Sequence, residues 1–330
     1  MKWNALILPP ESMLETVCSA ECRKLLEEHF HPVWNTASRD YTQDQLMERI
    51  GDADVVLTSW GSPILTEDHL REAKRLKMIG HAAGSLKGKV PDTVFQGRNI
   101  RLFSAAPRIA LSVGEYCLAV LLNGLWRFPQ LHGQVGSGIW RNGAFGRELR
   151  GQTVGIVSAS ATAKAFIRLL EPFQVQIRIY DPYLTRESAE RLGAVQCGLE
   201  EIMRCPIISV HAPSIPETKN LLSAEYIRMI PDGAIFINSS RGAVLDEKAL
   251  VEQLRTGRFF AALDVLEEEP PSPDHPLLGL DNVLLTPHVA GMTVEGCRTL
   301  MFEIVQDMIR ASEGKPTRYE IGETAWSLMA

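Results

Sequence analysis

The sequence predicts an α/β protein with two doubly wound parallel sheets. Two stretches of the chain alternate short apolar runs with amphipathic stretches, one over the first hundred residues and one from Gly151 to Leu285. Strands that alternate with helices in this way are typical of parallel sheets with helices on both faces. The length of 330 residues also exceeds one ordinary core of ~150 residues, so we expect two domains.

The composition narrows the class of protein. A chain that is 45% hydrophobic and 22% charged is typical of globular proteins and too apolar for disorder. The net charge of −6 argues against a nucleic-acid partner held by bulk electrostatics. No run of eighteen apolar residues occurs, and the apolar run at the start is too short for a signal peptide, so we expect neither a membrane span nor a leader.

The six cysteines are scattered along the chain. Cys18 and Cys22 lie four residues apart, but no second pair completes a zinc site. We therefore expect free thiols, no bound metal and a cytoplasmic protein.

The first hundred residues give the elements of one sheet. We expect strands at Ala5–Leu8, Ala53–Thr58 and Leu76–His81, and helices at Glu11–Phe30 and from the N-cap Thr66 to about Arg75.

A long apolar stretch, Ala110–Phe128, follows this first system. It predicts a helix with a broad apolar face that is buried between domains or subunits. Glu115 within it is either a buried, paired carboxylate or a residue at the rim.

The second alternating system contains six predicted strands, the number in a complete dinucleotide-binding sheet. The expected strands are Thr153–Ser158, Val175–Tyr180, Ile207–His211, Ala234–Asn238, Ala261–Val265 and Val283–Leu285. The expected helices are Thr162–Leu170, Arg186–Leu192, Ala224–Met229 and Glu247–Thr256, followed by a C-terminal amphipathic helix from Thr293 to Glu313 and a polar end.

A dinucleotide site needs a strand, a glycine-rich turn, a helix start and an acidic residue at the end of the next strand. Here the strand runs to Val157, and Asp181 follows the turn by about twenty residues, but the three glycine positions of G-x-G-x-x-G hold Ser158, Ser160 and Ala163. Indeed no glycine occurs between Gly155 and Gly193.

Two interpretations of this glycine-free turn stay open. Ser158 must make a tight turn with a Cβ atom, at a cost of about 1 kcal/mol if its φ is positive, and the Cβ of Ser160 lies where the backbone should approach a pyrophosphate. In one interpretation the hydroxyls and the helix N-terminus still bind the pyrophosphate. In the other, cofactor binding is weakened or lost.

Asp181 bears on the choice of cofactor. A carboxylate accepts hydrogen bonds from two ribose hydroxyls and repels a 2′-phosphate, which favours NAD over NADP. Arg178 and Arg186 are near in sequence and could soften that preference.

Three segments place polar residues directly after predicted strands, where open α/β sheets hold their sites. Arg241, Glu269 and His288 lie in these segments and together suit hydride transfer to a 2-keto acid. A guanidinium can hold the substrate carboxylate and carbonyl, and an imidazole can donate the proton that the carbonyl oxygen gains. A carboxylate against the other imidazole nitrogen favours the protonated ring and fixes its orientation.

From Ala105 to the helix after Thr293 the chain resembles the D-isomer-specific 2-hydroxyacid dehydrogenase family. The matching segments are Gly138–Trp140, Glu148–Gly151, Tyr180–Pro182, Ser209–Pro213, Glu217–Thr218, Asn238–Gly242, Leu263–Pro270 and Thr286–Gly291. The resemblance implies Arg241 as the substrate anchor, Glu269 as the partner of the histidine, and His288 as the acid/base.

The resemblance also implies further contacts with the cofactor. It places Asp264 near the nicotinamide carboxamide and His211–Pro213 beside the adenosine. With the turn and the strand ends, the expected cofactor-binding residues are Ser158, Ala159, Ser160, Ala161, Thr162, Asp181, Pro182, His211, Ala212, Pro213, Thr218, Ser239, Ser240, Arg241, Asp264, His288 and Gly291.

The domain plan follows from the same resemblance. It implies two Rossmann-like domains, with a dinucleotide-binding domain of residues 105–292 inserted into a flavodoxin-like substrate domain of residues 1–104 and 293–330. A turn in the substrate domain that offers backbone N–H groups to the substrate carboxylate matches Ala83, Gly84 and Ser85, with Arg241 and His288 completing the expected substrate contacts.

The sequence departs from the family directly after this turn. Lys87 and Lys89 stand where the family has an aspartate-containing turn; they either attract a further anionic group or are simply solvated.

The resemblance also implies a partner. The family is typically homodimeric through the cofactor domain, in the region that Ala110–Phe128 resembles.

Two functions therefore remain in view. The first is an NAD-dependent oxidoreductase that moves a hydride between nicotinamide and C2 of a small 2-keto or 2-hydroxy acid. The second is a cofactor-sensing or partner-binding protein, similar to corepressors built on a dehydrogenase scaffold, which the missing glycines motivate and the intact Arg241, Glu269 and His288 argue against.

Overall fold

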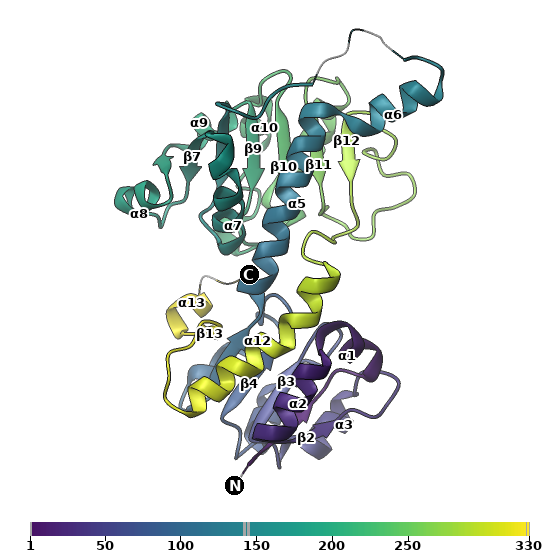
Figure 1. Cartoon of the computed structure of the whole chain (residues 1–330). Coiled ribbons are helices and arrows are strands. Elements are labelled where there is room, and N and C mark those ends of the chain that lie inside the picture. Colours follow the sequence, from purple (N-terminus) through teal and green to yellow (C-terminus); the bar gives the residue numbers. More distant parts are fainter. Residues whose placement is uncertain (1, 141–142, 144–145, 328, 330) are drawn as a thin grey trace. The chain divides into compact units, whose positions relative to one another are not determined.

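The computed structural model describes every residue except 1, 141, 142, 144, 145, 328 and 330. The chain forms two compact units (Figure 1). The first unit contains Met1–Ile109 and Met292–Ala330, and the second contains Ala110–Gly291. The first unit is thus built from two separate stretches of sequence, with the whole second unit between them.

The first unit is built on a six-stranded sheet in the order β13-β5-β4-β3-β1-β2. Its strands are β1 (Trp3–Ile7), β2 (Phe30–Trp34), β3 (Val55–Thr58), β4 (Met78–His81), β5 (Arg101–Ser104) and β13 (Glu320–Ile321). The first five strands are parallel, and their order is that of flavodoxin-like sheets. β13 pairs antiparallel with β5 at the sheet edge, so the sheet is not wholly parallel.

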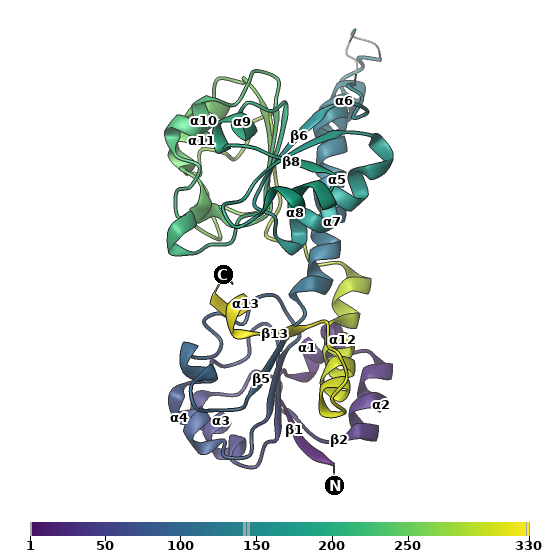
Figure 2. The ribbon, with the colours of Figure 1, turned by 90° about the vertical axis from the view of Figure 1, so that its left-hand side faces the viewer.

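Helices cover both faces of this sheet (Figure 2). They are α1 (Glu11–Val17), α2 (Ala20–His29), α3 (Gln43–Ile50), α4 (Glu67–Glu72), α12 (Val294–Ser312), α13 (Glu323–Ser327) and the 3-10 turn η1 (Asp92–Phe95). α1, α2 and α12 pack together over one face around Leu14, Leu26 and Ile304. α3 and α4 cover the other face around Ile50 and Leu70.

The expected helix Glu11–Phe30 is wrong, because the chain forms two helices there. α1 ends before Cys18, and the hydroxyl of Ser19 accepts a hydrogen bond from the amide of Cys22 at 3.2 Å, which starts α2. The N-cap at Thr66 is confirmed, since its hydroxyl accepts from the amide of His69.

The second unit is built on a seven-stranded, wholly parallel sheet in the order β12-β11-β10-β9-β6-β7-β8. Its strands are β6 (Thr153–Val157), β7 (Gln176–Tyr180), β8 (Ala194–Gln196), β9 (Ile207–Val210), β10 (Ile235–Asn238), β11 (Phe260–Leu263) and β12 (Val283–Leu285). The expectation of six strands is thus one short: it lacks the three-residue edge strand β8. The chain order reverses between β6 and β9, the position where such sheets bind ligands.

The helices of the second unit lie on both faces of its sheet (Figure 2). They are α5 (Ala106–Trp126, whose first turn belongs to the first unit), α6 (Phe128–Gly136), α7 (Ala161–Leu170), α8 (Arg186–Arg191), α9 (Leu199–Met203), α10 (Ala224–Arg228), α11 (Glu247–Leu254) and the 3-10 turns η2 (Glu171–Phe173), η3 (Pro216–Thr218) and η4 (Gly242–Val244). α5 and α7 cover one face, and α10 and α11 cover the other.

Helix α5 is a core helix of the second unit. Among the described helices it alone has the length and composition to cross a membrane, but half of its apolar window is buried inside the protein. A Cβ atom on Gly114 would lie 3.0 Å from the backbone of Ala165 in α7, and one on Gly124 would lie 3.0 Å from the ring of Phe260. Glu115 is exposed, which favours the rim position over a buried pair.

Candidate active site

The polar residues expected after three strands do lie at one edge of the second sheet. β10, β11 and β12 are neighbouring parallel strands, so their carboxyl ends meet at the same edge. Arg241 follows β10, Glu269 follows β11 and His288 follows β12. The fold therefore gathers these three loops from segments that span almost fifty residues of sequence.

His288 and Glu269 form a direct pair. The Nδ1 atom of His288 lies 2.7 Å from Oε2 of Glu269, while the other carboxylate oxygen accepts the amide of Leu266 at 3.0 Å. An ionised carboxylate can only accept, so Nδ1 carries the proton of this bond. This leaves Nε2 as the ring nitrogen that can exchange a proton with a bound molecule. The His288 side chain is 47% exposed and so can be reached.

Asp264 holds the backbone on which His288 sits. Its buried carboxylate accepts the hydroxyl of Thr286 at 2.6 Å and the amides of Val289 and Ala290 at 2.9 and 2.8 Å. Its backbone oxygen accepts the amide of His288 at 2.9 Å. His288 has a φ of 56°, a left-handed conformation that is rare for a non-glycine residue, and this set of bonds holds it there.

Tyr116 extends this network from helix α5, and sequence reasoning missed it. Its phenol lies 2.6 Å from the hydroxyl of Thr286. Burial raises the pKa of Tyr116, so the phenol stays protonated. Thr286 lies two residues before His288. This proximity in sequence is the one signal that could have pointed to Thr286, and none pointed to Tyr116.

Arg241 stands on a turn that Asn238 ties together. The amide nitrogen of Asn238 donates to the carbonyl of Arg241 at 3.1 Å, and its oxygen accepts the amide and hydroxyl of Ser240 at 3.1 and 2.8 Å. The guanidinium is exposed and donates to the carbonyl of Ser240 at 2.7 Å. The Ser239 hydroxyl lies 3.2 Å from the thiol of Cys117, so it is engaged within the protein.

Gly242 brings the Arg241 turn against the loop that carries Glu269. A Cβ atom on Gly242 would lie 2.0 Å from the carbonyl carbon of Leu266 and 2.4 Å from the amide nitrogen of Glu267. Real Cβ contacts are never this short, so only glycine permits this packing. The arginine and the His288–Glu269 pair are therefore linked through packed backbone.

The glycine-free turn makes the conformation that a glycine would make. Ser158 has a φ of 75°, and its hydroxyl donates to Oδ2 of Asp181 at 3.2 Å. The amide of Ala159 donates to the same oxygen at 2.8 Å. The side chain of Asp181 thus compensates for the strained serine from the end of the neighbouring strand.

The start of helix α7 fits an anionic group. Ser160 is the N-cap, with its hydroxyl 3.4 Å from the amide of Ala163 and 2.9 Å from the hydroxyl of Thr162. The amides of Ala161 and Thr162 begin the helix and have no acceptor one turn earlier. A dinucleotide's pyrophosphate carries the charge that these amides and the helix dipole favour, so the residues present fit the group.

The carboxylate of Asp181 binds the turn itself and still has room to bind a ligand. Besides Ser158 and Ala159, its second oxygen accepts the amide of Tyr183 at 2.8 Å. Four lone-pair positions on an ionised carboxylate leave room for one further donor, such as a ribose hydroxyl. Pro182 beside it is exposed.

His211 lies wholly inside the unit. Its two ring nitrogens lie 2.9 Å from the hydroxyls of Thr162 and Ser209. Burial lowers its pKa to about 3, so the ring is neutral at physiological pH. His211 thus supports the turn from inside the protein, and Ala212 next to it is also buried. The Thr218 hydroxyl donates to the carbonyl of Pro213 at 2.5 Å.

The turn expected to bind a carboxylate follows β4 in the first unit. Ala83 is buried, the Ser104 hydroxyl donates to the carbonyl of Gly84, and the amide of Lys87 donates to the hydroxyl of Ser85 at 3.0 Å. Because these bonds brace the turn, its geometry is defined before any ligand arrives.

Lys87 is neither a free anion receptor nor simply solvated. Its ammonium lies 2.8 Å from the carboxylate of Asp92 and 4.6 Å from the ring centroid of Trp326. A hydrogen bond from Lys87 lowers the pKa of Asp92. The charge of Lys87 therefore has a partner already.

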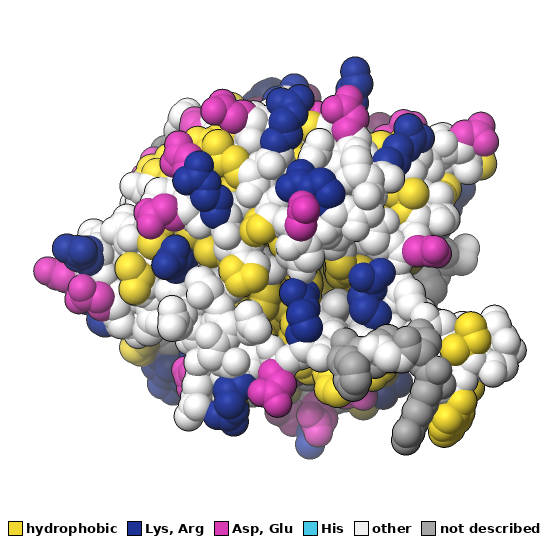
Figure 3. Space-filling view, turned by 90° about the horizontal axis from the view of Figure 1, so that it is seen from above, with side chains coloured by type: hydrophobic (Ala, Val, Ile, Leu, Met, Phe, Trp, Pro, Cys, Tyr) yellow, Lys and Arg dark blue, Asp and Glu magenta, His cyan; other side chains and the backbone are white. Residues whose placement is uncertain are grey.

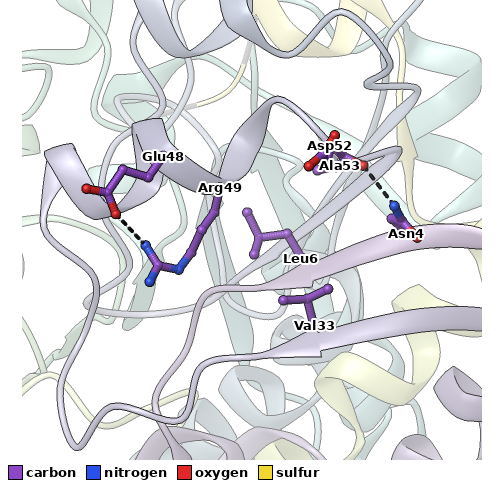
Figure 4. Close-up of a pocket in the computed structure, with 7 residues that line it drawn as sticks. All are labelled: Asn4, Leu6, Val33, Glu48, Arg49, Asp52 and Ala53. Atoms are coloured by element: carbon purple, nitrogen blue, oxygen red, sulfur yellow. Dashed lines mark hydrogen bonds and ion pairs between the residues drawn. The ribbon is translucent and has the colours of Figure 1, made fainter.

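The first unit also has a shallow pocket, which none of the site residues described above lines (Figure 4). It is lined by Asn4, Leu6, Val33, Glu48, Arg49, Asp52 and Ala53. Its polar groups pair with one another, since Arg49 lies 3.1 Å from Glu48, and Asn4 donates to the carbonyl of Asp52 at 3.1 Å. It contains none of the residues that the sequence singled out, and we assign it no function.

Comparison with known proteins identifies the family. Residues 118–290 match the family described as D-isomer specific 2-hydroxyacid dehydrogenase, NAD binding domain. The chain is 34% identical over 276 residues to D-3-phosphoglycerate dehydrogenase of Methanocaldococcus jannaschii, which covers 82% of this chain and 52% of that protein. It is 32% identical to the Haemophilus influenzae enzyme of the same name, over 83% of this chain and 68% of that one.

A solved structure agrees over nearly the whole chain. The phosphoglycerate oxidoreductase of Rhizobium etli superimposes with a TM-score of 0.81 at 26% identity, covering 97% of this chain and 99% of that one. Our chain spans about half the length of several curated relatives that it matches, all named D-3-phosphoglycerate dehydrogenase. These likenesses show that the chain belongs to the D-isomer specific 2-hydroxyacid dehydrogenase family, with its NAD-binding domain in the second unit.

Proposed function

We propose that this protein is an NAD-dependent oxidoreductase that transfers a hydride between nicotinamide and C2 of a small 2-keto or 2-hydroxy acid. The observation that carries the proposal is the His288–Glu269 pair, at 2.7 Å, on loops packed against the Arg241 turn. A histidine–glutamate pair by itself can have a structural or a catalytic role. One that stands at the carboxyl edge of an NAD-binding sheet, beside an exposed guanidinium, fits proton transfer coupled to hydride transfer.

Each side chain has a distinct part in this reaction. Arg241 holds the acid's carboxylate and its carbonyl oxygen through the planar guanidinium. His288 donates a proton from Nε2 to the carbonyl oxygen during reduction and takes it back during oxidation. Glu269 orients the ring and stabilises its charged form. The nicotinamide, when bound, supplies or accepts the hydride.

The cofactor in this proposal is NAD. The turn Ser158–Thr162 and the first amides of α7 would bind the pyrophosphate, and Asp181 would accept a ribose hydroxyl. A 2′-phosphate would meet this carboxylate, which three donors hold in place, and would be repelled. Ser239, Ser240, Asp264 and Gly291 line the same sheet edge and complete the proposed cofactor contacts.

The two units have different parts in the proposal. Residues 105–292 would bind the dinucleotide, and residues 1–104 with 293–330 would bind the acid. In the second group the turn at Ala83, Gly84 and Ser85 would offer amides to the substrate carboxylate. A Cβ atom on Gly84 would meet open space, so we expect Gly84→Ala to fold, to raise KM for the keto acid and to leave NADH affinity unchanged.

Titration with NADH and a screen of keto acids test the function. We expect saturable NADH binding by fluorescence, followed by loss of NADH absorbance with one or more of glyoxylate, pyruvate, hydroxypyruvate and 2-ketoglutarate. Absence of saturable binding at millimolar NADH would sink the proposal and favour the partner-binding alternative that the missing glycines suggest. Binding without turnover of any acid would favour a cofactor sensor.

We also propose that the protein is a cytoplasmic homodimer that associates through α5 and α6. No described residue of α6 is buried, and Trp126, Phe128 and Trp140 are exposed on this segment. Figure 3 shows hydrophobic side chains (yellow) exposed among polar ones on one face of the molecule. Such exposed apolar groups are typical of an interface. Sedimentation at micromolar concentration should give a dimer, and Phe128→Glu should give a monomer; a monomeric parent would refute this.

A further inference from the structure

A second histidine–glutamate pair, His275 and Glu247, is more deeply buried than the pair of His288 and Glu269. Nε2 of His275 lies 3.1 Å from Oε1 of Glu247, and both side chains are 12% exposed. Glu247 is the first residue of helix α11, and His275 lies on the chain between Pro270 and β12. Neither residue has a part in the function proposed above.

The hydrogen bonds around His275 define its tautomer. The amide of Leu277 points at Nδ1 at 3.4 Å, so Nδ1 is an acceptor, and Nε2 carries the hydrogen that Glu247 accepts. The neutral ring therefore satisfies both of its nitrogens. A buried pair that is completed in this way serves to fix two segments to each other.

The second oxygen of Glu247 reaches the loop that carries Glu269. Oε2 of Glu247 accepts the amide of Glu267 at 2.8 Å, two residues before Glu269. The same Leu266–Glu267 peptide also packs against Gly242 with no room for a Cβ atom. The amide of Leu266 then donates to Glu269 itself at 3.0 Å. We call the contacts of the Leu266–Glu267 peptide with Glu247 and Gly242 the clamp; they hold the backbone two to three residues before the carboxylate that faces His288.

The clamp opposes the electrostatic repulsion among neighbouring carboxylates in this loop. Glu267, Glu268 and Glu269 are three consecutive carboxylates, and all three are exposed. Their mutual repulsion and hydration favour a loop that swings away from the protein. A proton-transfer group needs its partner within a fraction of an ångström of the working position, and a loop with only solvated side chains would not supply that.

We propose that Glu247 and His275 are positioning residues that hold Glu269 against His288, so that the proton-transfer pair is assembled before substrate arrives. The proposal rests on the proposed function for its catalytic consequence, but not for its structural one. The charged groups that face His288 are Glu269 from the loop after β11 and Asp264, whose carboxylate binds the following two amides. Only Glu269 depends on the clamp.

Glu247→Gln is the first test variant, because it keeps the volume and removes the charge that binds the imidazole and the Glu267 amide. His275→Gln keeps a donor near the position of Nε2, and His275→Ala removes it. Asp232→Asn is the matched control: it breaks the Arg258–Asp232 ion pair (2.5 Å) in the same unit, but Asp232 lies before β10, at the opposite edge of the sheet.

The readout that needs no substrate is the proton NMR signal of the His288 Nδ1–H group in the full-length protein, identified by its loss in His288→Gln. A hydrogen bond to a carboxylate protects this proton from exchange. We expect its signal to broaden or vanish in Glu247→Gln and His275→Ala, to persist in His275→Gln, and to be unchanged in Asp232→Asn. In turnover, kcat should fall about tenfold in the first two, in line with a misplaced group, with NADH affinity and keto-acid KM within about twofold.

An unchanged Nδ1–H signal in Glu247→Gln and His275→Ala, with thermal unfolding near that of the parent, would overturn the proposal. If Glu247→Gln fails to fold, His275→Ala and His275→Gln still decide it between them. A parent protein that turns over no keto acid would refute the proposed function, whereas the NMR comparison would still stand or fall by itself.

Discussion

Ser158 is the residue at which this chain departs most clearly from the dinucleotide-binding pattern. Its φ of 75° costs a residue with a Cβ atom about 1 kcal/mol, and its hydrogen bond to Asp181 returns a similar amount. Ser158→Ala keeps the strain and loses the bond, so we expect a loss of about 1 kcal/mol in the free energy of unfolding, measured by urea denaturation. Ser158→Gly loses both and should lie closer to the parent. Equal loss in the two variants would contradict this account.

Ser160 poses a different question, because its hydroxyl is already engaged. It caps Ala163 and pairs with Thr162, and a glycine N-cap costs only a few tenths of a kcal/mol relative to serine. We therefore expect Ser160→Gly to bind NADH at least as tightly as the parent in a fluorescence titration. A tenfold weaker affinity would show instead that this hydroxyl contacts the phosphate directly.

At the scale of elements, the packing of the η4 turn against the loop after β11 carries the site. Gly242→Ala would force a Cβ atom to within 2.0 Å of the Leu266 backbone, and the loop would have to move. We expect a loss of about 3 kcal/mol or more in unfolding free energy, as for severe overpacking, together with loss of turnover. Gly233→Ala is a control for strain alone, since its positive φ is accompanied by open space; a loss as small as this control's would contradict the packing argument.

The elements that could be predicted well from the sequence are those whose formation depends on residues close together in the sequence. The strands β6, β9, β10 and β11 are apolar runs bounded by polar residues, and Thr66 caps α4 through its own hydroxyl. The break at Ser19 was missed because apolar residues continue through Cys18 and Cys22 at helical spacing, which hides the cap. β13 and α13 depend on remote partners: Ile321 pairs with Leu102, and the indole of Trp326 donates to Asp92.

The candidate site divides in the same way. Arg241, Glu269 and His288 could be singled out because each follows a recognisable strand, and parallel strands bring their ends together. Tyr116 and Glu247 could not, because their partners Thr286 and Glu267 lie 170 and 20 residues away, and no local pattern couples them. The turn Ser158–Thr162 was left open because hydroxyl geometry, which decides it, is a property of the folded loop.

At the scale of the whole molecule, each unit buries a neutral histidine that makes the fold sensitive to acid. Burial lowers the pKa of His81 in the first unit to about 4, with Lys89 adding to the effect, and that of His211 in the second to about 3. The unfolded chain takes up these protons near pH 6.5, before the folded chain does. Stability is therefore full above about pH 6.5 and falls as the pH drops toward 4.

Asp54 adds a second loss at lower pH. Burial alone would raise its pKa, but hydrogen bonds from Lys77, Asn4 and Arg75 outweigh burial and lower it. Its contribution is present above its unfolded pKa of about 3.9 and disappears as the pH falls through the folded value. Urea denaturation from pH 7 to about 3 should show falling stability, from the two histidines above about pH 4 and from Asp54 below about pH 3.9. The slope above pH 4 should be shallower in His81→Gln. A flat profile between pH 6.5 and 4.5 would contradict this prediction.

The most direct test of the whole account compares His288→Gln with the parent protein in two measurements on the same sample. If His288 is the group that exchanges the proton, single-turnover oxidation of NADH by the best keto acid should slow by a factor of about 10² to 10⁴, while the Kd for NADH stays within about threefold. Glu269→Gln should show a smaller loss in the same direction. Turnover by His288→Gln within a few-fold of the parent would contradict the central claim, since the proton would then come from another group.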